Sequence, residues 1–302
     1  MLPVIGYILQ VLSPVYPQDE ARAMALWLVE EMTGKTRSEI LLSQEPMEIH
    51  GLDGYLRRLV AGEPIQYLFG KTEWMGMTLR VTRDTLIPRP ETGELVEWLI
   101  QDALSPTAIN GFRFGVPHQK SQNGSVRLLD IGTGSGCIAI ALKKRFPAWE
   151  VTGWDVSEAA LRVARENAAR NGAAVRFEQV DILSSAAVEA KTGERRKDGN
   201  GYAFDVVVSN PPYVMEKERA KMAANVLRYE PETALFVSDD DPLLFYRAIT
   251  RLHLAPHVYF EINEQMGEAV RELLQTVRYD DAVIHKDSYG KDRMARGKII
   301  DN

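Results

Sequence analysis

The sequence predicts an α/β protein with a mostly parallel sheet, preceded by a small helical domain and a β-hairpin linker. From Val126 onward, short apolar runs alternate with amphipathic segments, which is typical of right-handed strand–helix–strand units. Residues 1–71 show helical periodicity and little alternation of period two. Residues 72–92 carry short β-rich runs and end in a proline-containing stretch. We therefore expect a helical domain at 1–71, a linker at 72–92 and an α/β domain at 93–302.

Length and composition set the broad class. A chain of 302 residues, 45% hydrophobic and 26% charged, is long enough for two domains and has an ordinary globular composition. The formal net charge of −6 offers no general attraction to nucleic acid or anionic membranes. A single cysteine, Cys137, excludes an intramolecular disulfide and any multi-cysteine metal site. Without a signal peptide or a run of ~20 apolar residues, we expect a soluble, cytoplasmic protein.

Helical spacing of apolar residues predicts the helical domain, and turn signals predict the linker that follows it. In residues 20–32, apolar side chains recur every three or four positions, which predicts an amphipathic helix ending at Gly34. Shorter helical pieces follow, so a small bundle is expected. In the linker, two β-rich runs, 77–81 and 85–87, with turn-like residues at Met75-Gly76 and Arg83-Asp84, predict a hairpin or an extended connector. Thr92 then stands where it could cap the next helix.

The α/β domain is predicted element by element. Strands are expected at 126–131, 149–155, 175–181, 204–210 and 257–262, with helices at 137–146, 157–172, 242–254 and 264–277. Residues 281–300 predict two further strands around a Tyr289-Gly290 turn, so the sheet ends on an antiparallel strand. Two polar segments, 105–125 and 184–201, are expected to be surface loops.

A glycine-rich turn follows the first strand of this domain. Ligands of open α/β sheets bind beyond the carboxyl ends of the strands. There, glycine alternates with small polar residues across 132–136, and glycine permits positive φ and lets a ligand lie against the backbone. A tight corner without a ligand is the alternative. Cys137 occupies the third position of a G-x-G-x-x-G motif, and no G-K-[ST] loop is present, which disfavours a nucleoside triphosphate.

Acidic residues end the next two strands. Asp155 lies at the tip of the second strand, where a carboxylate accepts hydrogen bonds from both hydroxyls of a ribose. Its alternative role is to cap the following helix, but Ser157 could do that instead. Asp181 and Ile182, at the end of the third strand, could flank an adenine, although an aspartate at a strand end is common.

The fourth strand ends in the sequence Ser-Asn-Pro-Pro-Tyr at 209–213. Asn210 offers an uncharged oxygen acceptor and an NH₂ donor. Pro211 and Pro212 stiffen the chain and leave their carbonyls free to accept from a ligand. Tyr213 supplies a flat face for stacking. Together these residues predict a rigid slot for a planar, NH₂-bearing group; a merely stiffened strand exit would explain the prolines alone.

This arrangement resembles the class I S-adenosylmethionine-dependent methyltransferases of the Asn-Pro-Pro-Tyr group, which methylate amide or exocyclic nitrogens. The Asn210 side-chain oxygen and the Pro211 carbonyl can hold both N–H bonds of such a nitrogen, orient its lone pair and stabilise the positive charge that builds on it. Because the sulfonium already activates the methyl group, no metal is expected. The five histidines also lack a metal-binding spacing such as H-E-x-x-H.

Further motifs narrow the resemblance to the peptide chain release factor N5-glutamine methyltransferases. They lie at 62–70, 86–97, 230–235, 261–265 and 290–293, and so extend from Gly62 to the C-terminal region. The resemblance implies a Rossmann-like, mostly parallel sheet of seven strands. It also implies methyl transfer to the glutamine side-chain amide of the Gly-Gly-Gln motif in class I release factors, docked by the helical domain.

The resemblance also assigns the site. The catalytic residues would be Asn210 and Pro211, within a substrate-binding stretch of Asn210, Pro211, Pro212 and Tyr213. The residues expected to bind S-adenosylmethionine are Gly132, Thr133, Gly134, Ser135, Gly136, Asp155, Asp181, Ile182 and Asn210. The expected partner is a release factor, with no direct binding of nucleic acid and no membrane association.

Three alternatives stay open at this point. A ribosomal-protein glutamine methyltransferase has a similar catalytic core. A DNA or RNA adenine-N6 methyltransferase would use the same slot, but it needs a basic groove and a route to a flipped base. A cofactor-binding scaffold without turnover is the third, and an intact Asn210 argues against it.

Overall fold

The computed structural model describes residues 3–43, 49–105, 125–193 and 201–299. It divides into two compact units, and each is described by itself. One unit combines Met1–Lys71 with Ala223–Tyr229, and the other combines Thr72–Met222 with Glu230–Asn302.

The first unit is helical, as residues 1–71 predict. Its helices are α1 (Pro3–Leu12), α2 (Gln18–Thr33), α3 (Arg37–Leu42), α4 (Leu52–Val60), α5 (Ile65–Phe69) and α10 (Ala224–Tyr229). The apolar faces of α1, α2 and α4 meet around the fully buried Ile8, Leu28 and Leu59. Helix α2 ends at Gly34 in the left-handed conformation, where the sequence predicts its end. The short α10 joins this unit through Tyr229, whose hydroxyl donates to the Ala61 carbonyl.

The linker forms the predicted hairpin but not all of its predicted strands. Strands β1 (Lys71–Trp74) and β2 (Met77–Arg80) turn at Met75-Gly76, both of which have positive φ. The second β-rich run, 85–87, forms no strand, because Thr85 closes a turn on the Thr82 carbonyl. Helix α6 (Pro90–Leu104) begins before Thr92 and has proline in its first turn. The expectation that Thr92 caps this helix is therefore wrong.

The second unit is built on the predicted seven-stranded, mostly parallel sheet. Its strands are β3 (Arg127–Ile131), β4 (Glu150–Asp155), β5 (Arg176–Gln179), β6 (Val206–Ser209), β9 (His257–Glu261), β10 (Val283–Lys286) and β11 (Asp292–Lys298). They lie in the order β10-β11-β9-β6-β3-β4-β5. The five strands from β9 to β5 are parallel, and β11 and β10 add antiparallel pairs at one edge, as the sequence predicts.

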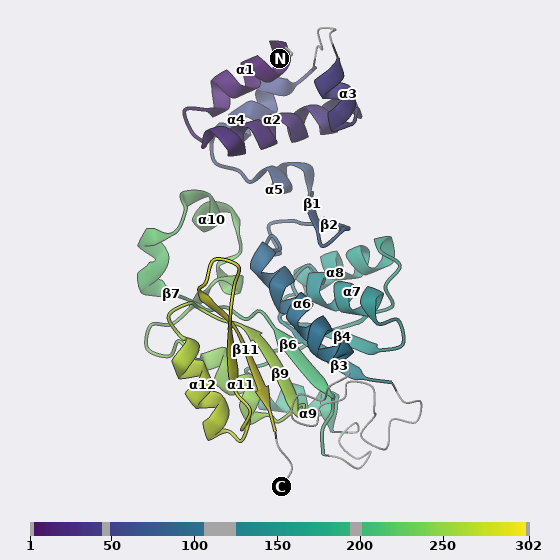
Figure 1. Cartoon of the computed structure of the whole chain (residues 1–302), viewed down its shortest axis with the longest axis vertical. Coiled ribbons are helices and arrows are strands. Elements are labelled where there is room, and N and C mark those ends of the chain that lie inside the picture. Colours follow the sequence, from purple (N-terminus) through teal and green to yellow (C-terminus); the bar gives the residue numbers. More distant parts are fainter. Residues whose placement is uncertain (1–2, 44–48, 106–124, 194–200, 300–302) are drawn as a thin grey trace. The chain divides into compact units, whose positions relative to one another are not determined.

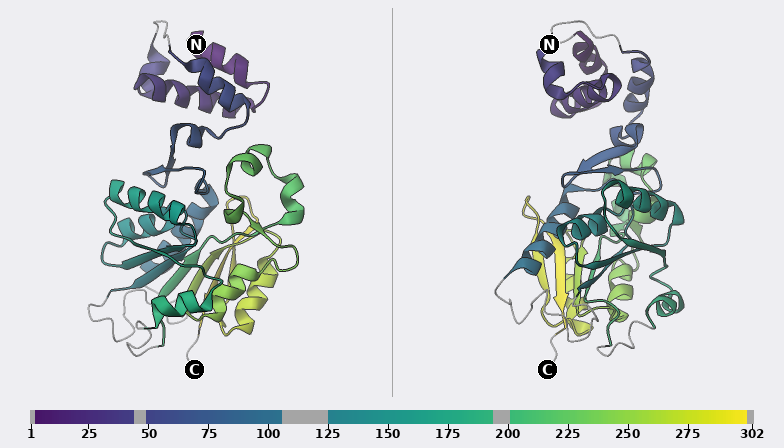
Figure 2. Two further views of the ribbon diagram at one scale, coloured as in Figure 1. Left: turned by 180° about the vertical axis from the view of Figure 1, so that it is seen from behind. Right: turned by 90° about the vertical axis from the view of Figure 1, so that its right-hand side faces the viewer.

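Helices cover both faces of this sheet (Figures 1 and 2). On one face lie α6, α7 (Cys137–Arg145) and α8 (Glu158–Arg170), and on the other lie α9 (Ser185–Thr192), α11 (Leu244–Arg251) and α12 (Gly267–Thr276). Successive residues of one strand pack into opposite cores. For example, Val206 and Val208 join the first core and Val207 joins the second. The unbroken apolar runs of these strands are the consequence of burial on both faces.

The predicted surface loop at 184–201 is partly wrong. Helix α9 occupies Ser185–Thr192, with Ser184 as its cap and Val188 buried against the core. The prediction failed because α9 has only eight residues, and so short a helix leaves little periodic signal. Most of the other predicted loop, 105–125, lies outside the described residues. After β6 the chain forms a small parallel pair, β7 (Val214–Met215) with β8 (Phe236–Val237).

Candidate active site

The carboxyl ends of the parallel strands bring the predicted site segments together. In the sheet register, Ile131 at the end of β3 lies opposite Trp154 of β4 and Ser209 of β6. Ser209 in turn lies opposite Phe260 of β9. The residues that follow these strands therefore emerge side by side: the glycine loop after β3, Asp155 ending β4 and Asn210 after β6.

The glycines of the 132–136 loop differ in what surrounds them. All three have positive φ: 69° at Gly132, 54° at Gly134 and 81° at Gly136. A Cβ atom at Gly136 would lie only 3.1 Å from the side chain of Ala164 in α8, so this glycine serves helix packing. At Gly132 and Gly134 a Cβ would meet nothing closer than 3.9 Å. These two positions therefore present bare backbone to open space.

Hydrogen bonds hold the loop rigidly against the sheet. The Thr133 N–H donates to the Trp154 carbonyl at 2.9 Å, and the Gly134 N–H donates to Asp155 Oδ2 at 2.9 Å. Buried Asn167 of α8 donates to the Ser135 carbonyl at 2.9 Å. The loop shape is thus set before any ligand binds.

Asp155 lies at the carboxyl end of β4, next to the glycine loop. Its Oδ1 accepts from the Ser157 N–H at 2.8 Å, and burial raises its pKa. Helix α8 is capped by the Ser157 hydroxyl, which accepts from the Ala160 N–H, so Asp155 is not its cap. Each carboxylate oxygen accepts one backbone bond and keeps a further lone pair.

Asp181 and Ile182 lie next along the sheet edge. The Val180 N–H donates to the Asp155 carbonyl at 3.0 Å, which brings this segment beside the end of β4. Asp181 is exposed and accepts from the Leu183 N–H at 2.9 Å. Ile182 is half-buried against the core beneath α9. Their role beside an adenine stays a prediction.

Asp130, one residue before the end of β3, is a polar group that the sequence interpretation missed. It is fully buried, and its Oδ2 accepts from the Thr133 hydroxyl at 2.6 Å. Its Oδ1 has no hydrogen-bond partner within the described residues. Burial raises the pKa of Asp130 to about 7. The sequence signal for Asp130 was an aspartate within the apolar run 128–131, two residues before Gly132.

Asn210 belongs to a chain of hydrogen bonds that reaches into the core. Its Nδ2 donates to the Thr92 hydroxyl at 3.0 Å, and that hydroxyl donates to Glu261 Oε2 at 2.6 Å. The Tyr213 hydroxyl donates to the other carboxylate oxygen, Oε1, at 2.8 Å. Asn210 is half-buried, and no hydrogen bond to its Oδ1 occurs within the described residues. Pro211 is buried beside it.

Thr92 and Glu261 had no predicted site role. Residue types alone pointed to helix capping for Thr92, whereas Glu261 entered only as part of a family motif. Thr92 is 118 residues from Asn210 and Glu261 is 169 residues from Thr92, so only the fold joins them. For Glu261, the sequence signal was a carboxylate directly after the three hydrophobic residues 258–260.

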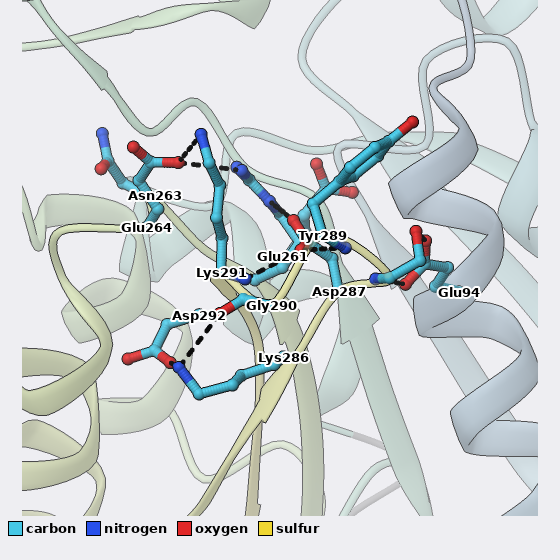
Figure 3. A network of polar contacts seen from close by, with 12 residues as sticks. Glu94, Glu261, Asn263, Glu264, Lys286, Asp287, Tyr289, Gly290, Lys291 and Asp292 are labelled. Carbon is cyan, nitrogen blue, oxygen red and sulfur yellow. Dashed lines mark hydrogen bonds and ion pairs between the residues drawn. The ribbon is translucent and has the colours of Figure 1, made fainter.

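Glu261 is almost completely buried, at 1% exposure. Burial raises its pKa, while the hydrogen bonds from Thr92 and Tyr213 and the positive charge of Arg293 act to lower it. The turn of the β10–β11 hairpin, residues 287–292, lies beside the end of β9 that carries Glu261 (Figure 3). In this turn Asp287 accepts from the Arg293 guanidinium at 3.2 Å, which secures the cation near Glu261.

The proline-containing linker is tied to the segment that follows the Asn-Pro-Pro-Tyr sequence. Arg89 forms an ion pair of 2.6 Å with buried Glu230, which also accepts from the Ile87 N–H at 3.3 Å. The Trp74 indole donates to the Arg89 carbonyl at 2.9 Å. These contacts set the start of α6 and therefore the position of Thr92.

Comparison of the chain with known proteins shows the family to which it belongs. Residues 9–70 match the model of the PrmC N-terminal domain, and residues 116–236 match that of the methyltransferase small domain. The chain is 39% identical over 300 residues to the release factor glutamine methyltransferase of Bacteroides thetaiotaomicron, with 96% of this chain and 97% of the relative covered. The relative of the same name from Flavobacterium psychrophilum is 36% identical, with 95% of each covered.

The chain belongs to the release factor glutamine methyltransferase family. It is a methyltransferase, and the resemblance drawn from the sequence is confirmed. The fold agrees with this family's class: the crystal structure of the hMettl16 catalytic domain in complex with the MAT2A 3′UTR hairpin 6 superposes with a TM-score of 0.54 at 15% identity. That comparison covers 75% of this chain and 77% of the other. At such low identity the likeness concerns the fold alone.

Two features bear on the expected location and metal content of this methyltransferase. Across residues 3–43, 49–105, 125–193 and 201–299, no helix combines the length and apolarity needed to cross a membrane. Within the same residues, no group of three or more His, Cys, Asp or Glu side chains is arranged to hold a metal ion. The cytoplasmic location and a metal-free reaction stay predictions.

Proposed function

We propose that this enzyme transfers a methyl group from S-adenosylmethionine to the side-chain amide nitrogen (N5) of the glutamine in the Gly-Gly-Gln motif of class I peptide chain release factors. The observation that carries the proposal is the tethered Asn210: its NH₂ is held by Thr92, so its oxygen remains to accept from a substrate. This chemistry agrees with the names of the full-length relatives.

The residues at the strand ends suit the cofactor. The space next to Gly132 and Gly134 allows a ligand to lie directly against the backbone. Any side chain at these two positions would fill that space. Asp155 retains lone pairs for ribose hydroxyls, and Asp181 and Ile182 adjoin it for the adenine. Asp130 Oδ1, which has no hydrogen-bond partner in the part of the chain that the structure describes, is an acceptor for the cofactor's ammonium group, directly or through a water molecule. When bound, S-adenosylmethionine supplies a methyl carbon activated by a positively charged sulfur.

Asn210 and Pro211 carry the chemistry on the protein side. An amide nitrogen is a weak nucleophile because its lone pair is delocalised into the carbonyl. Two acceptors, Asn210 Oδ1 and the Pro211 carbonyl, hold the two N–H bonds and stabilise positive charge as the N–C bond forms and the C–S bond breaks. The nitrogen would then release one proton to the surrounding water, with S-adenosylhomocysteine as the second product. Tyr213 and Pro212 shape the slot around the amide plane.

Recognition of the protein substrate is assigned to the helical unit. A single glutamine side chain offers far too little contact area for a specific protein–protein interface, which needs roughly 800 Å² on each partner. Residues 1–71 and Ala223–Tyr229 form one compact unit, which has a core of its own. It is therefore available to dock the release factor.

A direct assay tests the proposal. The purified enzyme is incubated with labelled S-adenosylmethionine and a class I release factor, a ribosomal protein fraction or adenine-containing DNA and RNA, and the label is mapped by mass spectrometry. We expect one added methyl group on the glutamine of the Gly-Gly-Gln motif. Label found only on a ribosomal protein or on nucleic acid would overturn the assignment and support one of the alternatives.

A further inference from the structure

We infer that Thr92 and Glu261 are positioning residues that set the rotation of the Asn210 side-chain amide, so that its oxygen rather than its NH₂ faces the substrate. The inference deepens the proposed function and rests on it for the identity of the substrate. The oxygen end and the NH₂ end of the Asn210 amide are similar in shape, but the oxygen accepts hydrogen bonds and the NH₂ donates them.

The direction of each bond follows from Glu261. An ionised carboxylate can only accept, so both hydroxyls that touch it must donate: Thr92 at 2.6 Å and Tyr213 at 2.8 Å. The proton of Thr92 is then committed to Glu261, and its oxygen must accept on the other side. At 3.0 Å only the NH₂ end of Asn210 can supply that bond. The Asn210 oxygen is thereby left facing outward.

Protonation of Glu261 would reverse the directions of the hydrogen bonds that join it, through Thr92, to Asn210. A protonated carboxyl can donate to Thr92, and the Thr92 hydroxyl proton is then free to turn toward Asn210. The amide would rotate to accept that proton with its oxygen and would present NH₂ outward. A substrate amide also presents N–H bonds, so donor would face donor and the nitrogen would lose its acceptor. The productive state therefore requires ionised Glu261.

The charged and titratable groups around Glu261 come from several elements. They are Glu91 of α6, Cys137 of α7, Tyr213 after β6, Tyr246 of α11 and Arg293 of β11. Arg293 is the cation among them and favours the ionised carboxylate, whereas burial opposes it. The pKa of Glu261 is raised above 4.5, so the inactive protonated form gains population as the solution is acidified from neutrality.

The test uses paired variants of Thr92. Thr92→Val removes the hydroxyl with little change in shape, and Thr92→Ser keeps it. Thr250→Val is the matched control, because Thr250 is also fully buried and its hydroxyl donates at 2.7 Å, but to a carbonyl within α11. We expect kcat on the release factor to fall at least about tenfold in Thr92→Val, with unchanged KM and cofactor affinity, and to recover in Thr92→Ser. Loss equal to that of Thr250→Val would overturn the inference.

A pH series separates positioning from mere structural support. The ratio of wild-type kcat to that of Glu261→Gln is measured from about pH 8 down to the lowest pH at which both enzymes stay folded, because groups shared by both enzymes cancel in the ratio. We expect the ratio to fall as pH falls, since only the wild type carries the titrating carboxyl. A ratio independent of pH contradicts the assignment of Glu261.

A spectroscopic experiment on the free enzyme tests the positioning of Asn210 without any substrate. The side-chain ¹⁵N signals of Asn210, identified by their loss in Asn210→Ala, are followed during acidification of the free enzyme. They should move in the wild type and stay unchanged in Glu261→Gln. If the wild type methylates no release factor but shows this behaviour, the proposed substrate is wrong and the positioning holds. Signals that do not respond to pH in the wild type refute the positioning.

Discussion

At the scale of single residues, this methyltransferase depends on groups whose hydrogen bonds are only partly satisfied by the protein. The NH₂ end of the Asn210 amide is bound to Thr92, and its oxygen has no hydrogen-bond partner among the described residues. Asp130 likewise has one oxygen bonded and one without a partner in the described residues. Buried polar groups are normally paired, because an unpaired one costs about 1–3 kcal/mol. The buried Asp130 oxygen is such an exception, and it lies near the carboxyl ends of the parallel strands, where ligands of open α/β sheets bind.

Substitution of Asn210 should affect the reaction more than cofactor binding. In Asn210→Ala we expect kcat to fall by about 10²–10³, because one of the two acceptors that stabilise charge on the substrate nitrogen is lost. Single-turnover kinetics and calorimetric titration with S-adenosylmethionine measure the two effects separately. Near-normal turnover would remove Asn210 from its proposed role.

Asp130 makes stability depend on pH in an unusual direction. Burial raises its pKa from 3.8 to about 7, so the folded protein binds this proton more tightly than the unfolded chain. Its contribution to the free energy of unfolding is therefore greatest below about pH 4 and is lost as pH rises to about 7. Relative to Asp130→Asn, the wild type should lose roughly 1.4 kcal/mol per unit of pKa shift across this window. Urea denaturation of both proteins at several pH values checks this, and a constant difference contradicts it.

At the scale of elements, the 132–136 loop combines two functions of glycine. Gly136 allows close packing on α8, while Gly132 and Gly134 leave the backbone bare. The packing role that a G-x-G-x-x-G motif assigns to its third glycine is thus filled here one residue earlier, at Gly136, and Cys137 begins α7. Spacing that departs from the dinucleotide motif still leaves the backbone of Gly132 and Gly134 uncovered.

Gly134→Ala tests the opening. The new methyl group would stand in open space with φ of +54°, so we expect a stability loss of about 1 kcal/mol from the left-handed backbone and a clear rise in the cofactor Kd. Gly172→Ala is the control, because Gly172 has a similar φ of +64° and a Cβ there would meet nothing within 4 Å, but it lies after α8. It should show the stability loss alone. Equal cofactor affinities in the two variants would argue against the loop as the binding surface.

At the scale of the whole molecule, catalysis and recognition are assigned to different units. The prediction is that a short peptide containing the Gly-Gly-Gln motif is methylated at least about tenfold less efficiently, in kcat/KM, than the intact release factor, because it lacks the surface that the helical unit would contact. Both substrates are compared with the same enzyme preparation, and a peptide with glutamate in place of glutamine provides the blank. Equal efficiencies would assign recognition to the α/β unit alone.

Several features of the fold could be predicted because they repeat along the chain. The alternation of apolar runs and amphipathic segments after Val126 predicted the order of strands and helices, and the Tyr289-Gly290 turn predicted the antiparallel edge. The glycine loop and the Asn-Pro-Pro-Tyr sequence are contiguous and recognisable. Short or polar elements such as α9 were missed, since their stability comes from packing and a cap rather than from periodicity.

The sequence by itself determined the class of fold, the family and the contiguous motifs at the strand ends, because these depend on local order along the chain. Only the tertiary structure decided which end of Asn210 is tethered, that Thr92 serves this site instead of capping a helix, and that Glu261 lies behind it. The physical reason is distance along the chain. Hydrogen bonds that join residues more than a hundred positions apart leave no periodic trace, and they form only when parallel strands bring their carboxyl ends to one edge of the sheet.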